Sequence, residues 1–208
     1  MSPAGAVRPA QSPDGVRPAR YRRAMAVISA TVAYAEARSR LTNAFRIILA
    51  IPHIIVSSVW GYAAEIVAVI QWFAIVFTGR RNEGMFRFQA DWFAYAARVN
   101  AYTYHLYDVY PPFGTDRGPV PMDVESPYDE PADRLTNGLR FIWIIPAAII
   151  GLGIAIALAA VLFVTWWAIL FTGKHPRGMW DFLLRAIKFS LQLSAYSLLL
   201  TDVYPKWT

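Results

Sequence analysis

Two long stretches of the chain are almost wholly apolar. Residues 47–77 hold one acidic residue, Glu65, one histidine, His53, and no Lys or Arg, while residues 141–171 hold no Asp, Glu, Lys, Arg or His. About 20 apolar residues are enough to cross a bilayer as a helix. Each stretch therefore predicts a membrane span. The alternative, a core helix of a soluble protein, needs a larger surrounding chain to bury it.

Each apolar stretch is followed by a segment with helical periodicity. Residues 85–107 and 179–201 carry large apolar side chains at spacings of three and four, with charged residues on the other face. This pattern predicts an amphipathic, aromatic helix. We expect these helices to be tilted spans; the alternative places them in the membrane interface, apolar face down. Two spans per half would orient both halves alike, and one span per half would invert them.

The two halves of the chain are copies of one another. RLTN, the Phe-Thr-Gly of WFAIVFTG and WWAILFTG, and DVYP each occur twice, 94 residues apart. An internal repeat of this kind fixes the architecture. The predicted organisation is a basic, mostly disordered N-terminal region (1–39), repeat 1 (40–113), an acidic, Pro-rich and flexible linker (114–133), and repeat 2 (134–208).

Each repeat predicts a helical hairpin. Leu-Thr-Asn offers a helix N-cap, and Gly79 or Gly173 ends the apolar helix. A helix of thirty-odd residues is about 45–50 Å long, so we expect a tilt, or a kink at Pro52 or Pro146. The predicted fold class is an all-α integral membrane protein. It has two tandem helical-hairpin repeats, each a long apolar span with a Pro-kinked start followed by an amphipathic aromatic helix.

Basic residues follow each Phe-Thr-Gly motif. A phosphate-binding loop needs G-x-x-x-x-G-K-[ST], but Ala168 and His175 stand at the positions of the first glycine and the hydroxyl residue. A helix stop with basic side chains at the lipid headgroups fits better. The candidate headgroup-contact residues are Arg80, Arg81, Lys174 and Arg177.

Glu65 lies at the centre of the first apolar stretch, where a charge is costly. If the hairpin turns near Arg81, Arg98 lies opposite Glu65. The second repeat has Ala159 and Gln192 at these positions, so the acid and the base are lost together. We therefore predict an intramembrane Glu65–Arg98 ion pair. It is either structural or part of a transport or proton path.

A second pair of charges recurs in both repeats. Arg46 and Arg140 begin the first helices, and Asp108 and Asp202 end the second helices. Hairpin geometry brings each arginine to the same membrane face as the aspartate of its repeat. We predict Arg46–Asp108 and Arg140–Asp202 contacts as an interfacial clasp. No nucleophile or base accompanies these aspartates, which argues against catalysis.

Composition narrows the chemistry and the partners. The chain of 208 residues is only 16% charged and has no cysteine, which excludes disulfides and thiolate catalysis. The three histidines are too scattered for a metal site, and we expect no metal and no cofactor. The arginine-rich start favours a cytoplasmic N-terminus. Anionic lipid headgroups are expected as partners, rather than nucleic acid.

The motifs RLTN..R…IPH, WFAI.FTG, G-M-[FW], A-Y and D-V-Y-P-P-F together resemble a bacterial, largely actinobacterial, membrane family, the domain of unknown function 4389. The resemblance covers residues 40–113 and 134–207. Repeat 1 departs from it at Asn82-Glu83, and repeat 2 at Lys206-Trp207. The resemblance implies a multi-pass helical protein of the actinobacterial inner (plasma) membrane, and it supplies no enzyme, substrate or catalytic residue.

Two functions from different classes follow. The first is a non-enzymatic accessory or scaffold protein that binds lipid, a partner membrane complex or a second copy of itself. The alternative is a small transporter or channel that uses Glu65 and Arg98. A polar cavity that reaches Glu65 would favour transport, and a dry bundle with an exposed aromatic groove would favour scaffolding.

Overall fold

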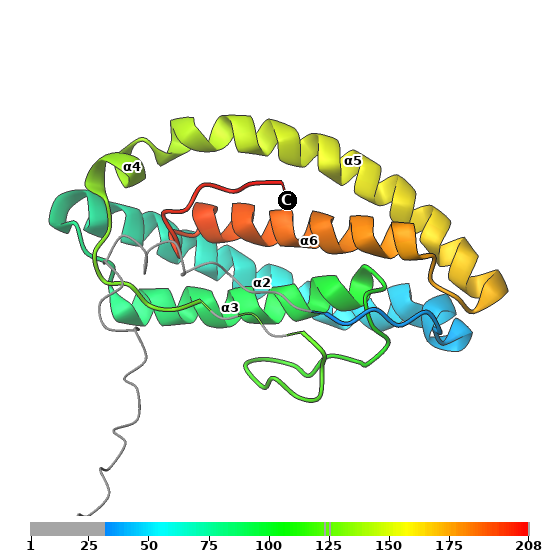
Figure 1. Cartoon of the computed structure of the whole chain (residues 1–208). Coiled ribbons are helices and arrows are strands. Elements are labelled where there is room, and N and C mark those ends of the chain that lie inside the picture. Colours follow the sequence, from blue (N-terminus) through cyan, green and yellow to red (C-terminus); the bar gives the residue numbers. More distant parts are fainter. Residues whose placement is uncertain (1–31, 123, 125, 208) are drawn as a thin grey trace, which may run out of the picture.

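The computed structural model describes residues 32–122, 124 and 126–207, and what was expected of residues 1–31 lies outside them. No strand occurs in this part of the chain, so the all-helical prediction is confirmed. The helices in chain order are α2 (Arg40–Thr78), α3 (Glu83–Thr103), α4 (Arg134–Gly138), α5 (Arg140–Thr172) and α6 (Arg177–Ser197) (Figure 1).

Both long helices end at the predicted glycines. Gly79 has φ 73° and Gly173 has φ 71°, in the left-handed region that a residue without Cβ adopts at no steric cost. The N–H of Gly79 donates to the carbonyl of Ile75, and that of Gly173 donates to the carbonyl of Ile169. The helix stops are therefore local in origin and identical in the two repeats.

The helix starts differ from the prediction. Leu-Thr-Asn lies inside the first turn, and the N-caps are Ser39, whose Oγ accepts from the N–H of Thr42, and Asp133, which accepts from the N–H of Thr136. These caps lie one residue before the RLTN motif. The side chain of Asn43 is thereby free to bond Trp166 of the other repeat, and that of Asn137 bonds Asp202 of its own repeat.

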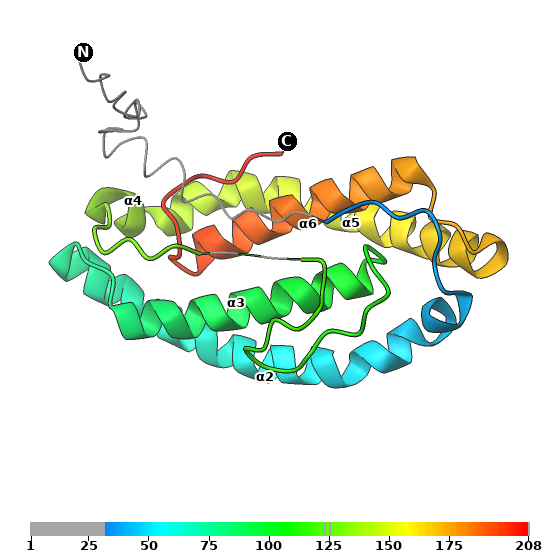
Figure 2. The ribbon, with the colours of Figure 1, turned by 60° about the horizontal axis from the view of Figure 1, so that its bottom comes forward.

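The long helices are continuous through their prolines, and their curvature is spread along the helix. α2 runs uninterrupted through Pro52 and α5 through Pro146, and both helices curve gradually along their length (Figures 1 and 2). An interruption occurs instead at Leu139, between α4 and α5. It follows Gly138, where repeat 1 has Ala44, and glycine weakens a helix by about 1 kcal/mol relative to alanine.

The two hairpins are inverted relative to one another. Asn43, near the start of α2, donates to the carbonyl of Trp166 near the end of α5, and Trp72, near the end of α2, donates to the carbonyl of Asn137 in α4. α2 and α5 therefore run antiparallel. α3 and α6 pack against each other, and in Figure 2 α3 lies in front of α2 and α6 lies in front of α5.

The core lies mainly between α3 and α6, and the linker contributes to it. Met122 and Val124 of the linker and Val32 of the N-terminal segment are buried against this core. The linker was expected to be flexible and solvated, but this part of it packs because its apolar side chains face α3 and α6. The central helix residues of the core are Phe86, Phe93, Ala97, Leu183 and Ile187.

α2 and α5 leave most of their apolar surface uncovered. Of the most apolar 18 residues of each helix, 22% are buried in α2 and 6% in α5. The core helix of a soluble protein is mostly buried, so these two helices do not fit that alternative. Both helices are long and apolar enough to cross a membrane. Their exposed side chains include Leu41, Ile48, Ile55, Val59, Ile66 and Phe77 on α2, and Phe141, Ile149, Ile156, Phe163 and Phe171 on α5.

Candidate functional site

A buried arginine joins the two ends of the first hairpin. The guanidinium of Arg46 is 1% exposed, and its Nη2 lies 2.5 Å from Oδ1 of Asp108. Its Nη1 donates to the carbonyls of Tyr102, at 2.5 Å, and Tyr107, at 2.8 Å. The same guanidinium lies 4.6 Å from the centre of the Tyr102 ring. We call this arrangement clasp 1.

The second hairpin repeats these contacts position for position. Nη2 of Arg140 lies 2.7 Å from Oδ1 of Asp202, and Nη1 donates to the carbonyls of Tyr196 and, at 3.0 Å, Thr201. The guanidinium lies 4.2 Å from the centre of the Tyr196 ring. We call this arrangement clasp 2. Both of the arginine–aspartate contacts that the sequence predicts are therefore present.

Clasp 2 also receives an arginine from the turn of the other repeat. Nη2 of Arg81 lies 2.6 Å from Oδ1 of Asp202, and its Nε donates to the carbonyl of Leu199 at 2.8 Å. Its Nη1 donates to the carbonyls of Asp129 and Pro131, both at 3.0 Å. Arg81 is only 4% exposed. The prediction that Arg81 contacts lipid headgroups is wrong, because the folded chain uses all of these donors internally.

At clasp 1 the equivalent turn residue is His175. Its side chain is fully buried, and its carbonyl accepts from the hydroxyl of Tyr34 at 2.8 Å. Burial lowers the pKa of His175 to about 4, so the imidazole is neutral at pH 7. Arg38 donates to the carbonyl of Leu106 at 2.8 Å, as Arg81 does to Leu199 at clasp 2. The two clasps therefore share a plan, but the second arginine comes from the segment before repeat 1 at clasp 1 and from the turn of repeat 1 at clasp 2.

Both clasps contain a residue in the left-handed backbone region. His105 has φ 62° and Leu199, its counterpart 94 residues on, has φ 63°. Neither ring nitrogen of His105 has a hydrogen-bond partner, and burial lowers its pKa to about 2. Among the described residues no group of three or more His, Cys, Asp or Glu is arranged to hold a metal. Nothing in the sequence marks these two backbone positions.

The segment before each repeat pairs with the turn of the other repeat. The N–H of His175 donates to the carbonyl of Glu36, and the N–H of Arg38 donates to the carbonyl of Gly173, at 2.8 and 2.9 Å. The equivalent two bonds, with the roles of the repeats exchanged, run from the N–H of Arg81 to the carbonyl of Glu130 and from the N–H of Ala132 to the carbonyl of Gly79, at 2.8 and 3.0 Å. Sequence reasoning missed this exchange. Its only signal was that Tyr34 and Glu36 recur as Tyr128 and Glu130.

Three of the four candidate headgroup residues are exposed. The side chains of Arg80, Lys174 and Arg177 are 74%, 68% and 62% exposed. Because α2 and α5 are antiparallel, Arg80 lies at one end of the bundle and the other two lie at the opposite end. Exposed ion pairs of this kind contribute little to stability. The pairs are Arg80–Glu130, Lys174–Glu36 and Arg177–Asp181.

The predicted Glu65–Arg98 ion pair is wrong. Glu65 lies on the exposed face of α2, whereas Arg98 is buried on α3 and donates to the carbonyl of Gly114 at 2.8 Å. The pairing of the two helices is shifted, since Trp92 contacts Ser57. Arg98 is therefore level with the first turns of α2, about four turns from Glu65.

The shift arises because the last turns of α2 extend beyond the start of α3. Gln89 of α3 donates to the carbonyl of Ala64, so α3 begins beside the body of α2 rather than beside its last turns. Those last turns pack against repeat 2 instead, where Trp72 contacts Asn137 and Phe141. The prediction paired residues at equal distances from the turn, and such pairing fails when one helix extends beyond the other.

The fold and the clasps define a class: an all-helical chain of two tandem, inverted repeats with two helices that are apolar enough to cross a membrane. The model of one family, Domain of unknown function (DUF4389), matches residues 40–115 and again residues 134–208. The chain belongs to this family and contains two copies of its domain. Comparison with curated proteins gives no match, and comparison with solved structures gives none.

Proposed function

We propose that this protein is a non-enzymatic accessory or scaffold protein of a bacterial plasma membrane, held in lipid by α2 and α5. The observation that carries the proposal is the uncovered apolar surface of these two helices. Contiguous apolar patches on soluble monomers rarely exceed a few hundred Å². Transfer of one exposed Ile, Leu or Phe side chain from water to an apolar phase is worth about 1.5–3 kcal/mol. Many such side chains together favour a stable membrane-bound state.

The ends of the bundle supply a second interaction with lipid. Arg80, Lys174 and Arg177 are exposed beside the last turns of α2 and α5 or at the start of α6. A basic residue near an anionic membrane surface contributes about 1 kcal/mol to binding. Anionic headgroups are therefore the lipid class that these ends fit best.

The clasps favour a structural role over chemistry. Asp108 and Asp202 are held by arginines that also bind backbone carbonyls. Each carboxylate also accepts from a backbone N–H, that of Ser39 for Asp108 and that of Asp133 for Asp202, so these hydrogen bonds support a structural role. The transport alternative depended on a Glu65–Arg98 pair, and the separation of these residues removes its support.

Vesicle flotation of the full chain tests the proposal. We expect the protein to float with phosphatidylcholine vesicles, to float more completely when phosphatidylglycerol is added, and to resist a carbonate wash. The double variant Ile55→Glu and Ile149→Glu should reduce flotation, because both residues lie on the uncovered apolar surface.

The matched control is the double variant Arg87→Gln and Arg185→Gln. These side chains are exposed on α3 and α6, and we expect flotation like that of the unchanged protein. A chain that stays monodisperse in detergent-free buffer and does not float would overturn the proposal. If the chain floats, the proteins that copurify with it from the native membrane in mild detergent identify the partner complex.

A further inference from the structure

We propose that α2 and α5 lie in the plane of a single leaflet instead of crossing the bilayer, with α3, α6 and the linker on the aqueous side. The inference rests on the proposed membrane association and specifies the surface that lipid occupies. Four observations carry it: the length of the apolar surface, the path of the linker, the charges at the two ends and the relation between the repeats.

The apolar surface is too long for a span. On α2 the exposed apolar side chains run from Leu41 to Phe77, and on α5 from Phe141 to Phe171. At about 1.5 Å per residue these stretches measure about 54 Å and 45 Å, whereas the hydrocarbon core is about 30 Å thick. Spanning helices would have to tilt by about 50°, beyond the observed range of about 0–40°. Helices that lie in the plane have no such mismatch.

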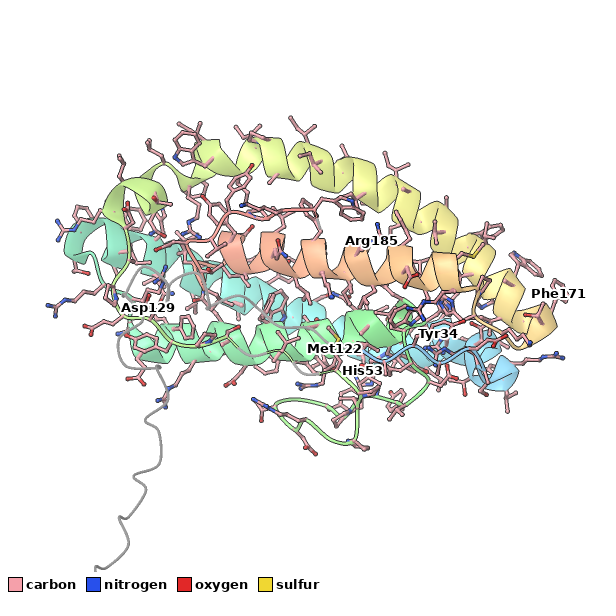
Figure 3. The ribbon with its side chains drawn as sticks, in the orientation of Figure 1. Tyr34, His53, Met122, Asp129, Phe171 and Arg185 are labelled. Carbon is pink, nitrogen blue, oxygen red and sulfur yellow. The ribbon has the colours of Figure 1, made fainter. Side chains whose placement is uncertain are left out.

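The described linker residues, 114–122, 124 and 126–133, run along the bundle without helical structure. α3 ends beside clasp 1, and the chain reaches Gly79, at the opposite end, where Ala132 donates to its carbonyl. Figure 3 shows the linker passing from Met122, near the middle, to Asp129, at the end of the bundle opposite Phe171.

The linker also carries exposed charges, including Asp116 and Glu130. In a spanning pose this irregular, charged chain would cross the hydrocarbon exposed to lipid, where unpaired backbone groups and ionised side chains are not tolerated. In the in-plane pose the exposed charges of the linker stay on the aqueous side of the bundle.

Both ends of the bundle are basic. A spanning pose places Arg80 on one side of the membrane and Lys174 with Arg177 on the other. Spanning proteins instead concentrate Lys and Arg on one side. The in-plane pose brings all three side chains to the same headgroup layer.

The inversion of the two repeats is compatible with both of them binding the same membrane surface. The repeats are inverted along the helix axes, so the two-fold axis that relates them is perpendicular to α2 and α5. In the in-plane pose this axis is normal to the membrane, and the repeats present equivalent faces: α2 and α5 to lipid, α3 and α6 to water (Figure 2). The exposed charges of α3 and α6 then lie in water; they include Arg87, Asp91 and Arg185.

Single cysteines distinguish the two poses, since the chain has no cysteine of its own. Arg80→Cys and Lys174→Cys place a thiol at opposite ends, and each removes one exposed ion pair and one proposed headgroup contact. Each variant is expressed as the full chain, and sealed membrane vesicles of one orientation are treated with a membrane-impermeant maleimide before and after permeabilisation.

The in-plane pose predicts that both cysteines behave alike: both are labelled before permeabilisation, or both gain at least tenfold after it. The spanning pose predicts that only one of the two gains. Opposite behaviour of the two positions therefore overturns the inference. Asp116→Cys in the linker should be labelled under the same condition as the other two cysteines. Ile149→Cys on α5 should stay unlabelled, even after permeabilisation, until detergent dissolves the membrane.

A carbonate wash of the same vesicles separates this inference from the proposed function. A chain that is lost from the membrane fraction contradicts the insertion of α2 and α5 into lipid, and with it both the proposed function and the in-plane pose. A chain that is retained, but whose two ends label from opposite sides, contradicts only the in-plane pose. Melting temperatures equal to that of the unchanged protein confirm that each variant is folded.

Discussion

Arg81 and Asp202 are 121 positions apart in the chain, yet Nη2 of Arg81 lies 2.6 Å from Oδ1 of Asp202. This pair connects the turn of repeat 1 to the last residues of repeat 2. The same carboxylate also binds Arg140. One aspartate therefore holds both the hairpin of its own repeat and the junction between the repeats.

Substitution of Arg81 tests this junction. We expect Arg81→Gln to lower the free energy of unfolding by about 1–3 kcal/mol, because it removes buried, charge-assisted hydrogen bonds while Asp202 keeps its pair with Arg140. The neighbouring variant Arg80→Gln is the control. Arg80 is exposed, so its loss should cost about 0–1 kcal/mol. Thermal melting in mild detergent checks both, and equal losses would contradict the structural role of Arg81.

Acidification tests the neutral state of His175. Its pKa in the folded protein is about 4, below the value of about 6.5 in an unfolded chain. Between these values the unfolded state binds more protons, so stability falls as the pH drops from 7 towards 4. The imidazole is surrounded by Arg38, Arg46, Asp108 and His105. We expect a lower melting temperature at pH 5 than at pH 7.5.

The control for this pH effect is His175→Gln, which removes the titrating group. We expect its melting temperature to depend less on pH than that of the unchanged protein. His105 has a lowered pKa and contributes in the same direction, so part of the effect should remain. An unchanged pH dependence in the variant would assign the effect to other groups.

The tryptophans of the Phe-Thr-Gly regions test the symmetry of the junction. Trp72 donates to the carbonyl of Asn137, and Trp166 donates to the carbonyl of Asn43. Trp72→Phe and Trp166→Phe each remove one such bond, so each should cost about 0.5–1.5 kcal/mol. Trp167→Phe serves as control, since Trp167 is an exposed residue, with 40% of its surface accessible. Chemical denaturation should show similar losses for the first two variants and little loss for the third.

The glycines that end the long helices test backbone conformation. Gly79→Ala and Gly173→Ala each place a Cβ at positive φ, which costs about 1–2 kcal/mol. The added Cβ would also lie 2.8 Å from Nε of Arg134 in the first variant, and 3.0 Å from Nε of Arg40 in the second.

Gly153→Ala is the opposite case and serves as the control. Gly153 lies inside α5, and a Cβ there meets nothing within 4 Å. Alanine should stabilise the helix by up to about 1 kcal/mol. Melting temperatures of the three variants should therefore move in two directions; a fall in all three would contradict this assignment.

The sequence predicted the features that depend on local chemistry or on the duplication. Gly79 and Gly173 end helices because of their own conformational freedom, and Arg46 and Asp108 meet because a hairpin brings its ends together. The recurrence of each pair 94 residues on supported both predictions.

The features that escaped prediction depend on the path of the whole chain. Glu65 and Arg98 were paired by counting from the turn, and that count ignores the turns of α2 that pack on repeat 2. The exchange of the segments around Glu36 and Glu130 is made by backbone groups, which side-chain patterns do not reveal. The repeats are inverted because the linker ends beside Gly79, at the far end of α2. An extended segment has no periodicity in its sequence that would indicate where it ends in space.

The reciprocal exchange between the repeats also has a consequence for biosynthesis. Arg81 leaves the ribosome 121 residues before Asp202, an interval of about 6–24 s at about 5–20 residues per second. Throughout that interval repeat 1 lacks the carboxylate that neutralises its arginine, and the segment around Glu130 that pairs with its turn is made only partway through the interval. The nascent chain therefore cannot complete its first half until Asp202 has been made, and loss of the segment that carries Asp202 would affect the part of the molecule that was synthesised first.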